Sequence, residues 1–317
     1  MKLQTIIPLE SQKHNLIDYN SNILMIGSCF SENIGEKFEY LKFKTYVNPF
    51  GILFNPVSIE NLITRAINLE YYQMDEFINR SELWFCLDAH SSLNQASEED
   101  LLITLNQALN STNAYLKEAT HVIITLGTSW VYRFLESDKI VANCHKLPQK
   151  QFLKEIMEVD AITQSLQAII AQLKSINQSL NVVFTVSPVR HLKDGFVENM
   201  RSKSHLINAI HNCIDPRQRV YYFPSFELMM DELRDYRFYN EDMVHPNQLA
   251  INYIWEKFQL VWISDESKTI LNAIQKIQNK LGHKAFNPKS AEHKKFLNQL
   301  QEDINTIRKK YPHISFD

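Results

Sequence analysis

Glycine is scarce in this chain. Only six of the 317 residues are glycine, well below the average share of roughly 7% in proteins, so most turns are built without it. Gly27 and Gly127 directly follow apolar runs typical of strands, and Gly51 lies in a loop flanked by prolines. Glycine at such points allows the backbone to turn sharply or to approach a ligand closely. The alternative interpretation of each of these glycines, taken alone, is that it lies in an ordinary turn.

Other shortages exclude several classes of protein. The four cysteines show no C-x-x-C spacing, which fits neither a disulfide framework nor a zinc ribbon. The net charge is only −3, so we expect neither nucleic acid nor an anionic membrane as a partner. No apolar run is long enough to span a bilayer. The first residues lack the layout of a signal peptide, and we therefore expect a cytoplasmic protein.

Short apolar runs recur at long intervals, with helical patterns between them. The runs cover 23–26, 122–126, 182–186 and 220–223, with a weaker one at 43–47. Helices are predicted over 32–40, 58–69 (from a Ser58 cap), 101–119, 152–176, 202–214 and 247–258. Continuous apolar runs are typical of strands buried on both faces. Their alternation with helices predicts parallel βαβ units and an α/β fold, a three-layer α/β/α sandwich.

In such a sheet, ligands bind outside the carboxyl ends of the strands. Gly27, Gly127 and Ser187 all fall at such ends, so we expect them to lie close together.

The chain changes character after about residue 263. Residues 264–280 and 290–310 predict two polar, charged helices joined by a linker at 282–288. We expect a main α/β domain over 1–263 and a C-terminal helical extension over 264–317. The extension packs on the main domain or forms a contact for a homo-oligomer. Its charges are interpreted as a solvated helix face.

Two candidate nucleophiles, Ser28 and Cys29, stand side by side after the first predicted strand. A strand that turns straight into a helix places these side chains above the sheet edge, beside the outward-pointing N–H groups of the helix start. A hydroxyl or thiol there can attack while its own N–H helps to bind an oxyanion. The helix N-terminus and a nearby histidine would lower the pKa of the thiol. The alternative is that Cys29 is a small buried residue and Ser28 the helix cap.

A second segment combines an acid and a base far along the chain, in Asp242-x-x-His245-Pro246. Proline suits the first position of the following helix, and His245 suits its cap. The spacing lets the carboxylate reach the imidazole, fix its tautomer and stabilise the imidazolium. Acidic residues also occur at helix N-termini for dipole reasons alone. That explains Asp242 but not His245, because a cation is disfavoured there.

A third group of polar side chains could bind a metal or a substrate. Asp88 and His90 are two residues apart, and His145 and His191 could join them. No spacing among them is diagnostic of a metal site. We therefore interpret them as contacts to substrate or as a hydrogen-bond network in the core.

Cations in loop-like segments add to this group. Arg190, Lys203 and Lys146 could hold a carboxylate or phosphate of a substrate. The alternative is a set of salt bridges to the acidic segment 231–235.

Taken together, these residues resemble the GSCFA family, a branch related to the SGNH/GDSL hydrolases. The likeness spans roughly residues 4–262 and rests on several stretches rather than one motif. They are IGSCFSENIG (26–35), NPFGILFNP (48–56), IITLGTSWVY (123–132), VANCHKLP (141–148), TVSPVRHLKDGFVENMRSKSHL (185–206) and YFPSFELMMDELRDYRFYNEDMVHPN (222–247). The resemblance implies a mostly parallel, flavodoxin-like sheet of the SGNH type.

The resemblance also implies catalytic roles. The Gly-Asp-Ser of the first SGNH block corresponds to Gly27-Ser28-Cys29, so Cys29 takes the position of the nucleophile and Ser28 replaces the aspartate. The Asp-x-x-His block is intact as Asp242 and His245. The thiol is a departure from the family of serine esterases, and it puts their standard activity in doubt.

The oxyanion hole departs from the pattern as well. Gly51 corresponds to the glycine whose N–H binds the oxyanion, and Gly127 and Thr128 open the third block. Ser129 stands where that block usually has asparagine. Loss of one such donor typically costs on the order of 10²–10³ in rate. Asn48, Asn143 or Arg190 could compensate.

The leading hypothesis is an SGNH-like esterase or O-acyltransferase that acts on an acyl ester of a carbohydrate or related metabolite without a cofactor. Cys29 (or Ser28) attacks, His245 is the base, Asp242 orients it, and the N–H groups of Cys29 and Gly51, with Thr128 or Ser129, bind the oxyanion. The candidates for substrate contact are Asp88, His90, Asn143, His145, Arg190 and His191.

Two alternatives come from other classes of function. One is a catalytically inactive binding protein on the same scaffold. The other, weaker one is a metal-dependent hydrolase that uses Asp88, His90 and His145.

Overall fold

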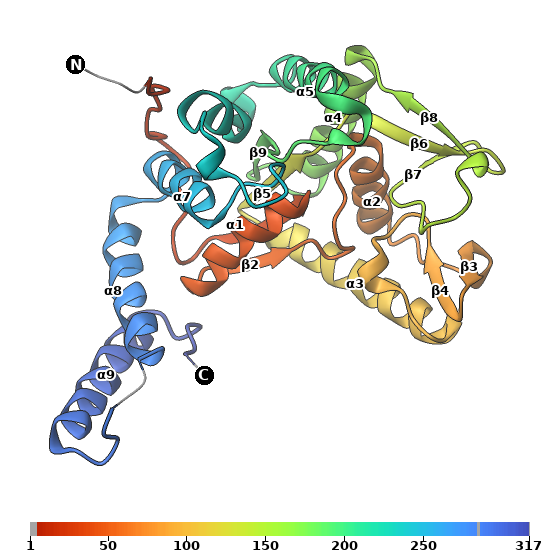
Figure 1. The fold of residues 1–317 in the computed structure, drawn as a ribbon. Coiled ribbons are helices and arrows are strands. Elements are labelled where there is room, and N and C mark those ends of the chain that lie inside the picture. Colours follow the sequence, from red (N-terminus) through yellow and green to blue (C-terminus); the bar gives the residue numbers. More distant parts are fainter. Residues whose placement is uncertain (1–4, 284–285, 317) are drawn as a thin grey trace.

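A five-stranded parallel sheet forms the centre of the molecule in a computed structural model, which describes residues 5–283 and 286–316 (Figure 1). Its strands are β1 (Asn22–Gly27), β2 (Lys44–Val47), β5 (His121–Leu126), β9 (Asn181–Val186) and β10 (Val220–Phe223). They are arranged in the order β10-β9-β5-β1-β2, and all neighbours pair in parallel. This is the flavodoxin-like order, whose direction reverses between β1 and β5. The predicted fold class is confirmed.

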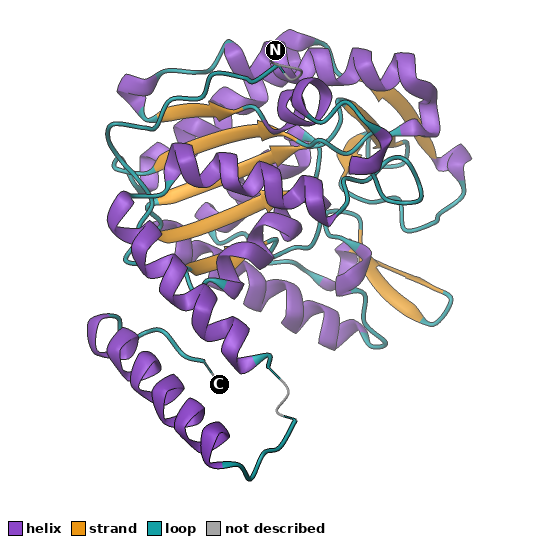
Figure 2. Ribbon diagram, turned by 60° about the vertical axis from the view of Figure 1, so that its left-hand side comes forward, coloured by secondary structure: helices purple, strands orange, loops and turns teal. Residues whose placement is uncertain are grey.

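Helices cover both faces of this sheet (Figure 2). One face is covered by α1 (Cys29–Tyr40) and α7 (Gln248–Trp262), the other by α2 (Pro56–Asn68), α3 (Glu98–Glu118), α4 (Val159–Ile176) and α5 (Gly195–His211). Along β1, Ile23 and Met25 belong to the core of the first face, and Leu24 and Ile26 to the core of the second. Alternate residues of a strand point to opposite faces, so this apolar run fills both cores.

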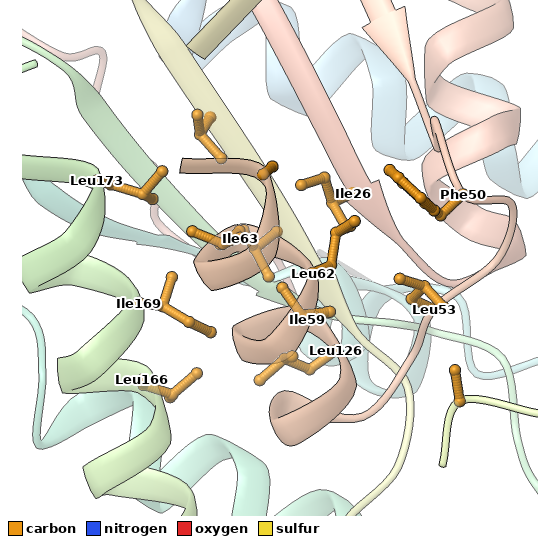
Figure 3. Packing of buried hydrophobic residues seen from close by; sticks show 14 of the residues in the cluster. Ile26, Phe50, Leu53, Ile59, Leu62, Ile63, Leu126, Leu166, Ile169 and Leu173 are labelled. Atoms are coloured by element: carbon orange, nitrogen blue, oxygen red, sulfur yellow. The ribbon is translucent and has the colours of Figure 1, made fainter. Parts of the chain in front are cut away.

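The second core shows how the helices are packed (Figure 3). Leu62 and Ile63 of α2 lie between Ile169 of α4 and the sheet residues Ile26 and Leu126. This packing fixes the loop before α2, which crosses the carboxyl ends of the strands.

Two small antiparallel sheets extend from one end of the molecule (Figure 1). They are the hairpin of β3 (Phe77–Arg80) and β4 (Leu83–Cys86), and a sheet in the order β7-β6-β8, with β6 (Trp130–Phe134), β7 (Lys139–Val141) and β8 (Phe152–Ile156). The sequence predicts a helix over 152–176. This prediction is wrong for residues 152–156, because they form β8 and pair with β6, from Ile156 opposite Trp130 to Phe152 opposite Phe134. Local periodicity does not report such long-range pairing.

Other predicted helix starts and caps also differ. α3 begins at Glu98 instead of 101, and Asn247 is the N-cap of α7, so the predicted His245 cap and the predicted Pro246 start are wrong. The first helix begins at Cys29 instead of 32, and α5 begins at Gly195 instead of 202. The predicted Ser58 cap is wrong, because Asn55 is the N-cap and its Oδ1 accepts the Ser58 N–H at 2.9 Å. Proline at the first helical position suits that start.

The remaining elements are short. A single turn, α6 (Ser225–Glu227), leads into a π-helical turn at 228–232. Turns of 3₁₀ helix lie at 74–76, 91–93, 149–151, 192–194, 216–218 and 236–238.

The C-terminal segment forms two helices, α8 (Asp265–Leu281) and α9 (Ala291–Lys310), as predicted. They project from the sandwich as a hairpin (Figure 1). Their apolar residues are continuous with the core on the α1 side, where the Tyr311 ring lies 5.4 Å from that of Tyr19. Residues 284 and 285 of the expected linker lie outside the described residues. The division at residue 263 and the homo-oligomer through these helices stay predictions. No described helix is both long and apolar enough to cross a bilayer.

Replacing Gly27 by alanine tests how tightly β1 approaches β5. A Cβ at Gly27 would lie 2.3 Å from the carbonyl oxygen of Thr125, so the backbone must shift. We expect Gly27→Ala to lower the free energy of unfolding by about 1–3 kcal/mol, the usual cost of overpacking. Gly282→Ala is the control, since its Cβ would meet nothing closer than 3.6 Å. Urea unfolding measures both, and equal stability of the two variants would contradict this account.

Candidate active site

The turn from β1 into α1 positions the two candidate nucleophiles differently. The N–H of Ser28 donates to the Thr125 carbonyl at 3.1 Å, and its Oγ caps α1 by accepting the Phe30 N–H at 3.2 Å. Ser28 is only 3% exposed. Cys29 is the first residue of the helix, and its thiol is half-buried. The Ser28 hydroxyl is therefore engaged as a helix cap, whereas the Cys29 thiol lies half-buried at the start of the helix.

The environment of Cys29 raises the pKa of its thiol. Burial is the largest cause, and the carboxylate of Glu32 adds to it. The ammonium of Lys203 and the N–H groups at the helix start act in the opposite direction. The thiolate predicted from the helix N-terminus and a histidine is therefore not favoured, because burial outweighs the helix start. A base is needed to deprotonate this thiol near neutral pH.

Lys203 lies buried at the carboxyl edge of the sheet. It projects from α5, is 1% exposed, and donates from Nζ to the carbonyl oxygens of Gly127 at 2.6 Å and Ser187 at 2.8 Å. These bonds join the ends of β5 and β9, as expected for Gly127 and Ser187. Burial lowers the pKa of Lys203 to about 7, while Cys29 acts to raise it. The sequence did contain a signal for this burial, since Asn199, Lys203 and Leu206 share the buried face of α5.

The predicted acid–base pair is formed. Asp242 Oδ2 lies 2.6 Å from Nδ1 of His245. Its Oδ1 accepts the N–H groups of His245 and Val244, both at 2.9 Å. These backbone bonds, and then the imidazole, lower the pKa of Asp242 to about 2. An ionised carboxylate on Nδ1 keeps the proton there and leaves Nε2 of His245 as the basic atom. Both side chains are about half exposed, at 49% and 46%.

The segment after β9 connects this pair to the buried edge. The Arg190 N–H donates to the Val244 carbonyl at 3.4 Å. Next to it, Nε2 of His191 is buried without a hydrogen-bond partner, and it would lie 3.3 Å from a Cβ placed on Gly127. Burial, then the charges of Lys203 and His245, lower the pKa of His191 to about 4. His191 is therefore neutral at physiological pH.

Three of the groups predicted to bind the oxyanion, those of Gly51, Thr128 and Ser129, are already engaged. The Gly51 N–H donates to the Asn48 carbonyl at 2.8 Å. Asn48 in turn accepts the Gly27 N–H on its Oδ1 at 2.9 Å, so its side chain supports the nucleophile turn. Gly51 adopts a φ of +70°, and a Cβ there would lie 2.4 Å from that of His90. This close packing against His90 explains why residue 51 is glycine. An oxyanion role is not needed to explain it, and the Gly51 N–H is already bonded to Asn48.

Thr128 and Ser129 belong to a buried network with Ser202 of α5. Thr128 Oγ1 lies 2.9 Å from Ser202 Oγ, which accepts the Ser129 N–H at 2.8 Å. Ser129 Oγ donates to the Ser202 carbonyl at 3.2 Å. Both side chains are therefore used to hold the loop after β5 on α5. Sequence reasoning missed Ser202 because its partners lie far away in the chain.

The three candidates for a metal site, Asp88, His90 and His145, make other contacts in the structure. His145 is buried, and its Nε2 lies within hydrogen-bond distance of the carbonyl oxygens of Cys86 (2.9 Å) and Ala89 (3.1 Å). Asp88 approaches Arg65 at 4.0 Å. Across residues 5–283 and 286–316, no cluster of three or more His, Cys, Asp or Glu side chains could hold a metal ion. His90 and Asn143 line a cavity of ≈ 390 Å³.

Residues 22–258 match the model of the GSCFA family. The chain belongs to this family. Residues 274–317, which include the C-terminal part of α8 and the whole of α9, match the model described as "GSCFA domain protein, C-terminal domain". No curated protein matches this GSCFA chain.

Two solved structures resemble this GSCFA protein over most of its length. One is a carbohydrate esterase family 3 protein from Talaromyces cellulolyticus, with 7% identity and a TM-score of 0.38. The other is an acetyl esterase mutant determined with an acetate ion, with 8% identity and a TM-score of 0.38. Each alignment covers 81% of this chain and 99% of the other. A likeness this weak carries no conclusion about activity.

The buried ammonium of Lys203 predicts a distinctive dependence of stability on pH. Its folded-state pKa of about 7 lies below the ordinary lysine value of 10.5. Between these values the unfolded chain binds more protons, so the free energy of unfolding rises with pH. We expect urea unfolding from pH 7.5 to 9.5 to show this rise in the wild type relative to Lys203→Met. The exposed Lys150→Met is the control and should follow the wild type. Parallel curves for wild type and Lys203→Met would contradict the lowered pKa.

Proposed function

We propose that this GSCFA protein is a hydrolase of ester bonds that uses Cys29 as nucleophile, His245 as general base and Asp242 to orient it. The observation that carries the proposal is the closed Asp242–His245 pair, whose carboxylate fixes the imidazole with Nε2 free. Cys29 supports it from the carboxyl end of β1, the edge at which ligands bind in parallel sheets. The substrate class is an O-acyl ester of a carbohydrate or related metabolite.

The reaction follows the logic of a catalytic triad. His245 Nε2 takes the proton of the Cys29 thiol, and the sulfur attacks the acyl carbon. The tetrahedral intermediate collapses as the C–O bond breaks, and the imidazolium protonates the leaving alkoxide. A thioester remains on Cys29. His245 then deprotonates a water molecule, whose oxygen attacks the thioester carbon; the C–S bond breaks, the acid leaves, and the imidazolium returns the proton to the Cys29 sulfur. A sugar hydroxyl in place of water would make the protein an O-acyltransferase.

Of the donors predicted for the oxyanion, this proposal keeps the Cys29 N–H and replaces those of Gly51, Thr128 and Ser129. The Cys29 N–H lies at the start of α1, where the helix dipole favours negative charge. The second donor in this proposal is His191, since neutral imidazole can carry a proton on its buried, unpaired Nε2. In its protonated form, Lys203 at the same edge stabilises the thiolate and, in this proposal, the oxyanion as well.

A catalytically inactive binding protein is the second candidate. The raised pKa of Cys29 favours it, as does the engagement of the Gly51 N–H within its own turn. On this scaffold the same edge would hold a ligand without attacking it.

Removal of the base tests the hydrolase. We expect His245→Ala to lower the rate of hydrolysis of 4-nitrophenyl acetate on the order of 10²–10⁴-fold, the usual contribution of a general base. The substitution should not unfold the protein, because the side chain is about half exposed. The exposed His14→Ala is the matched control and should keep full activity. Full activity in His245→Ala would exclude this relay.

Alkylation of Cys29 separates the two candidates. We expect iodoacetamide to modify Cys29 with an apparent pKa above the usual value of roughly 8.5, since burial raises the pKa of the thiol. If His245 serves as the base, His245→Ala should slow alkylation near neutral pH. Peptide mass spectrometry measures each cysteine, with Cys213 as the internal control. An equal rate at Cys29 in both proteins would favour the binding protein.

A further inference from the structure

A cavity of ≈ 390 Å³ adjoins the candidate active site beside β6 and β7. This volume lies in the usual range of small-molecule sites, roughly 300–1,000 Å³. The aromatic side chains of Phe54, Trp130 and Tyr132 form much of its wall. Phe54 connects it to the catalytic edge: its carbonyl accepts the Gly127 N–H at 2.8 Å, and its ring lies 6.0 Å from that of His191. Phe54 therefore belongs both to the cavity wall and to the strand edge that carries Gly127 and His191.

The described lining of this cavity contains two ammonium groups and no carboxylate. Lys146 and Lys193 both contribute to it, and within the described chain neither forms an ion pair with Asp or Glu. The acid that follows Lys193, Asp194, is paired with Lys154. Lys193 lies along the wall, with Nζ 3.5 Å from the Tyr132 hydroxyl. The rim therefore carries uncompensated positive charge above an aromatic surface.

The loop that carries Lys146 is held in place by contacts within the protein. His145 and Lys146 adopt φ values of 44° and 58°, a left-handed conformation that non-glycine residues rarely adopt. The buried ring of His145 anchors this loop, stacked 4.4 Å from Phe85. Asn143 Oδ1 also accepts the His145 N–H at 2.8 Å. Disfavoured backbone held by such contacts is typical of functional sites, and it keeps Lys146 at the rim.

We propose that this cavity binds an apolar group that bears a carboxylate or a phosphate, with the apolar part against Phe54 and Trp130 and the oxyanion paired with Lys146 and Lys193. Aromatic walls favour burial of a ring or short chain, and ammonium groups without acidic partners favour an anion. In combination with the proposed function, which this step rests on, the bound group is the part of the ester next to the scissile bond. Binding of the group itself needs no catalysis.

Isothermal titration calorimetry with four inert probes tests the proposal. Phenyl phosphate and phenylacetate carry both features, 2-phenylethanol lacks the charge, and inorganic phosphate lacks the apolar part. We expect at least one of the first two to bind about tenfold or more tightly than either of the others, and the tighter one identifies the oxyanion. Equal binding of 2-phenylethanol, or equal binding of inorganic phosphate, would overturn the proposal.

Cys144 lines the same cavity and reports where the probe binds. We expect the tighter probe to slow alkylation of Cys144 severalfold while Cys213, which does not line the cavity, is unaffected. The double variant Lys146→Gln, Lys193→Gln should lose both the tenfold preference and the protection. Lys150→Gln, an exposed lysine outside the lining, is the matched control. Protection that survives the double variant, or that is absent in the wild type, would overturn the assignment.

The hydrolase proposal and the cavity proposal can be tested separately. Probe binding is measured in the wild type and in His245→Ala, and the cavity proposal predicts equal affinity in both. An inactive protein that still binds the anionic probes would exclude the hydrolase and keep the cavity site. An active esterase that does not distinguish the probes would exclude the cavity site and keep the hydrolase.

Discussion

The ammonium group of Lys203 holds together the edge at which the candidate reactive groups lie. Its hydrogen bonds to the Gly127 and Ser187 carbonyls join the ends of β5 and β9. A buried charge is costly unless it is hydrogen-bonded, and these two strand ends supply the acceptors. The segments that leave them carry the network around Thr128 and the imidazole of His191. Their positions depend on this one side chain, whose field also reaches the Cys29 thiol.

The acid–base pair is held by a different means. In many relays the carboxylate is buried, whereas Asp242 is about half exposed. Its orientation comes instead from two backbone N–H groups in its own turn, which is closed by the Asn240 N–H on the His245 carbonyl at 2.8 Å. Solvent weakens electrostatic interactions at such a position. The geometry of the turn, rather than a low dielectric, must therefore supply the alignment of His245.

Much of the fold could be predicted from the sequence, and less of the site. Four of the five parallel strands were predictable because each is largely a continuous apolar run, which burial on both faces requires, whereas the half-buried β2 gave a weaker signal. The β7-β6-β8 sheet was missed, since its pairing joins segments that look unremarkable alone. The Asp242–His245 pair was predictable because its partners are three residues apart. The engagement of Ser129 was not, because its partner Ser202 comes from α5, seventy-three positions along the chain.

The raised pKa of Cys29 need not reduce its reactivity. Thiolate nucleophilicity rises with the pKa of the thiol, so a thiol that is harder to ionise yields a stronger nucleophile once deprotonated. A solvent-exposed thiol with a low pKa would be attacked by any oxidant, whereas the half-buried Cys29 ionises only when a base acts on it. In the proposed mechanism the reaction therefore depends on His245 as the base, and the protonated form of Lys203 stabilises the thiolate as it forms. If the protein is an enzyme, its control over the reaction lies in these neighbours rather than in the acidity of the thiol.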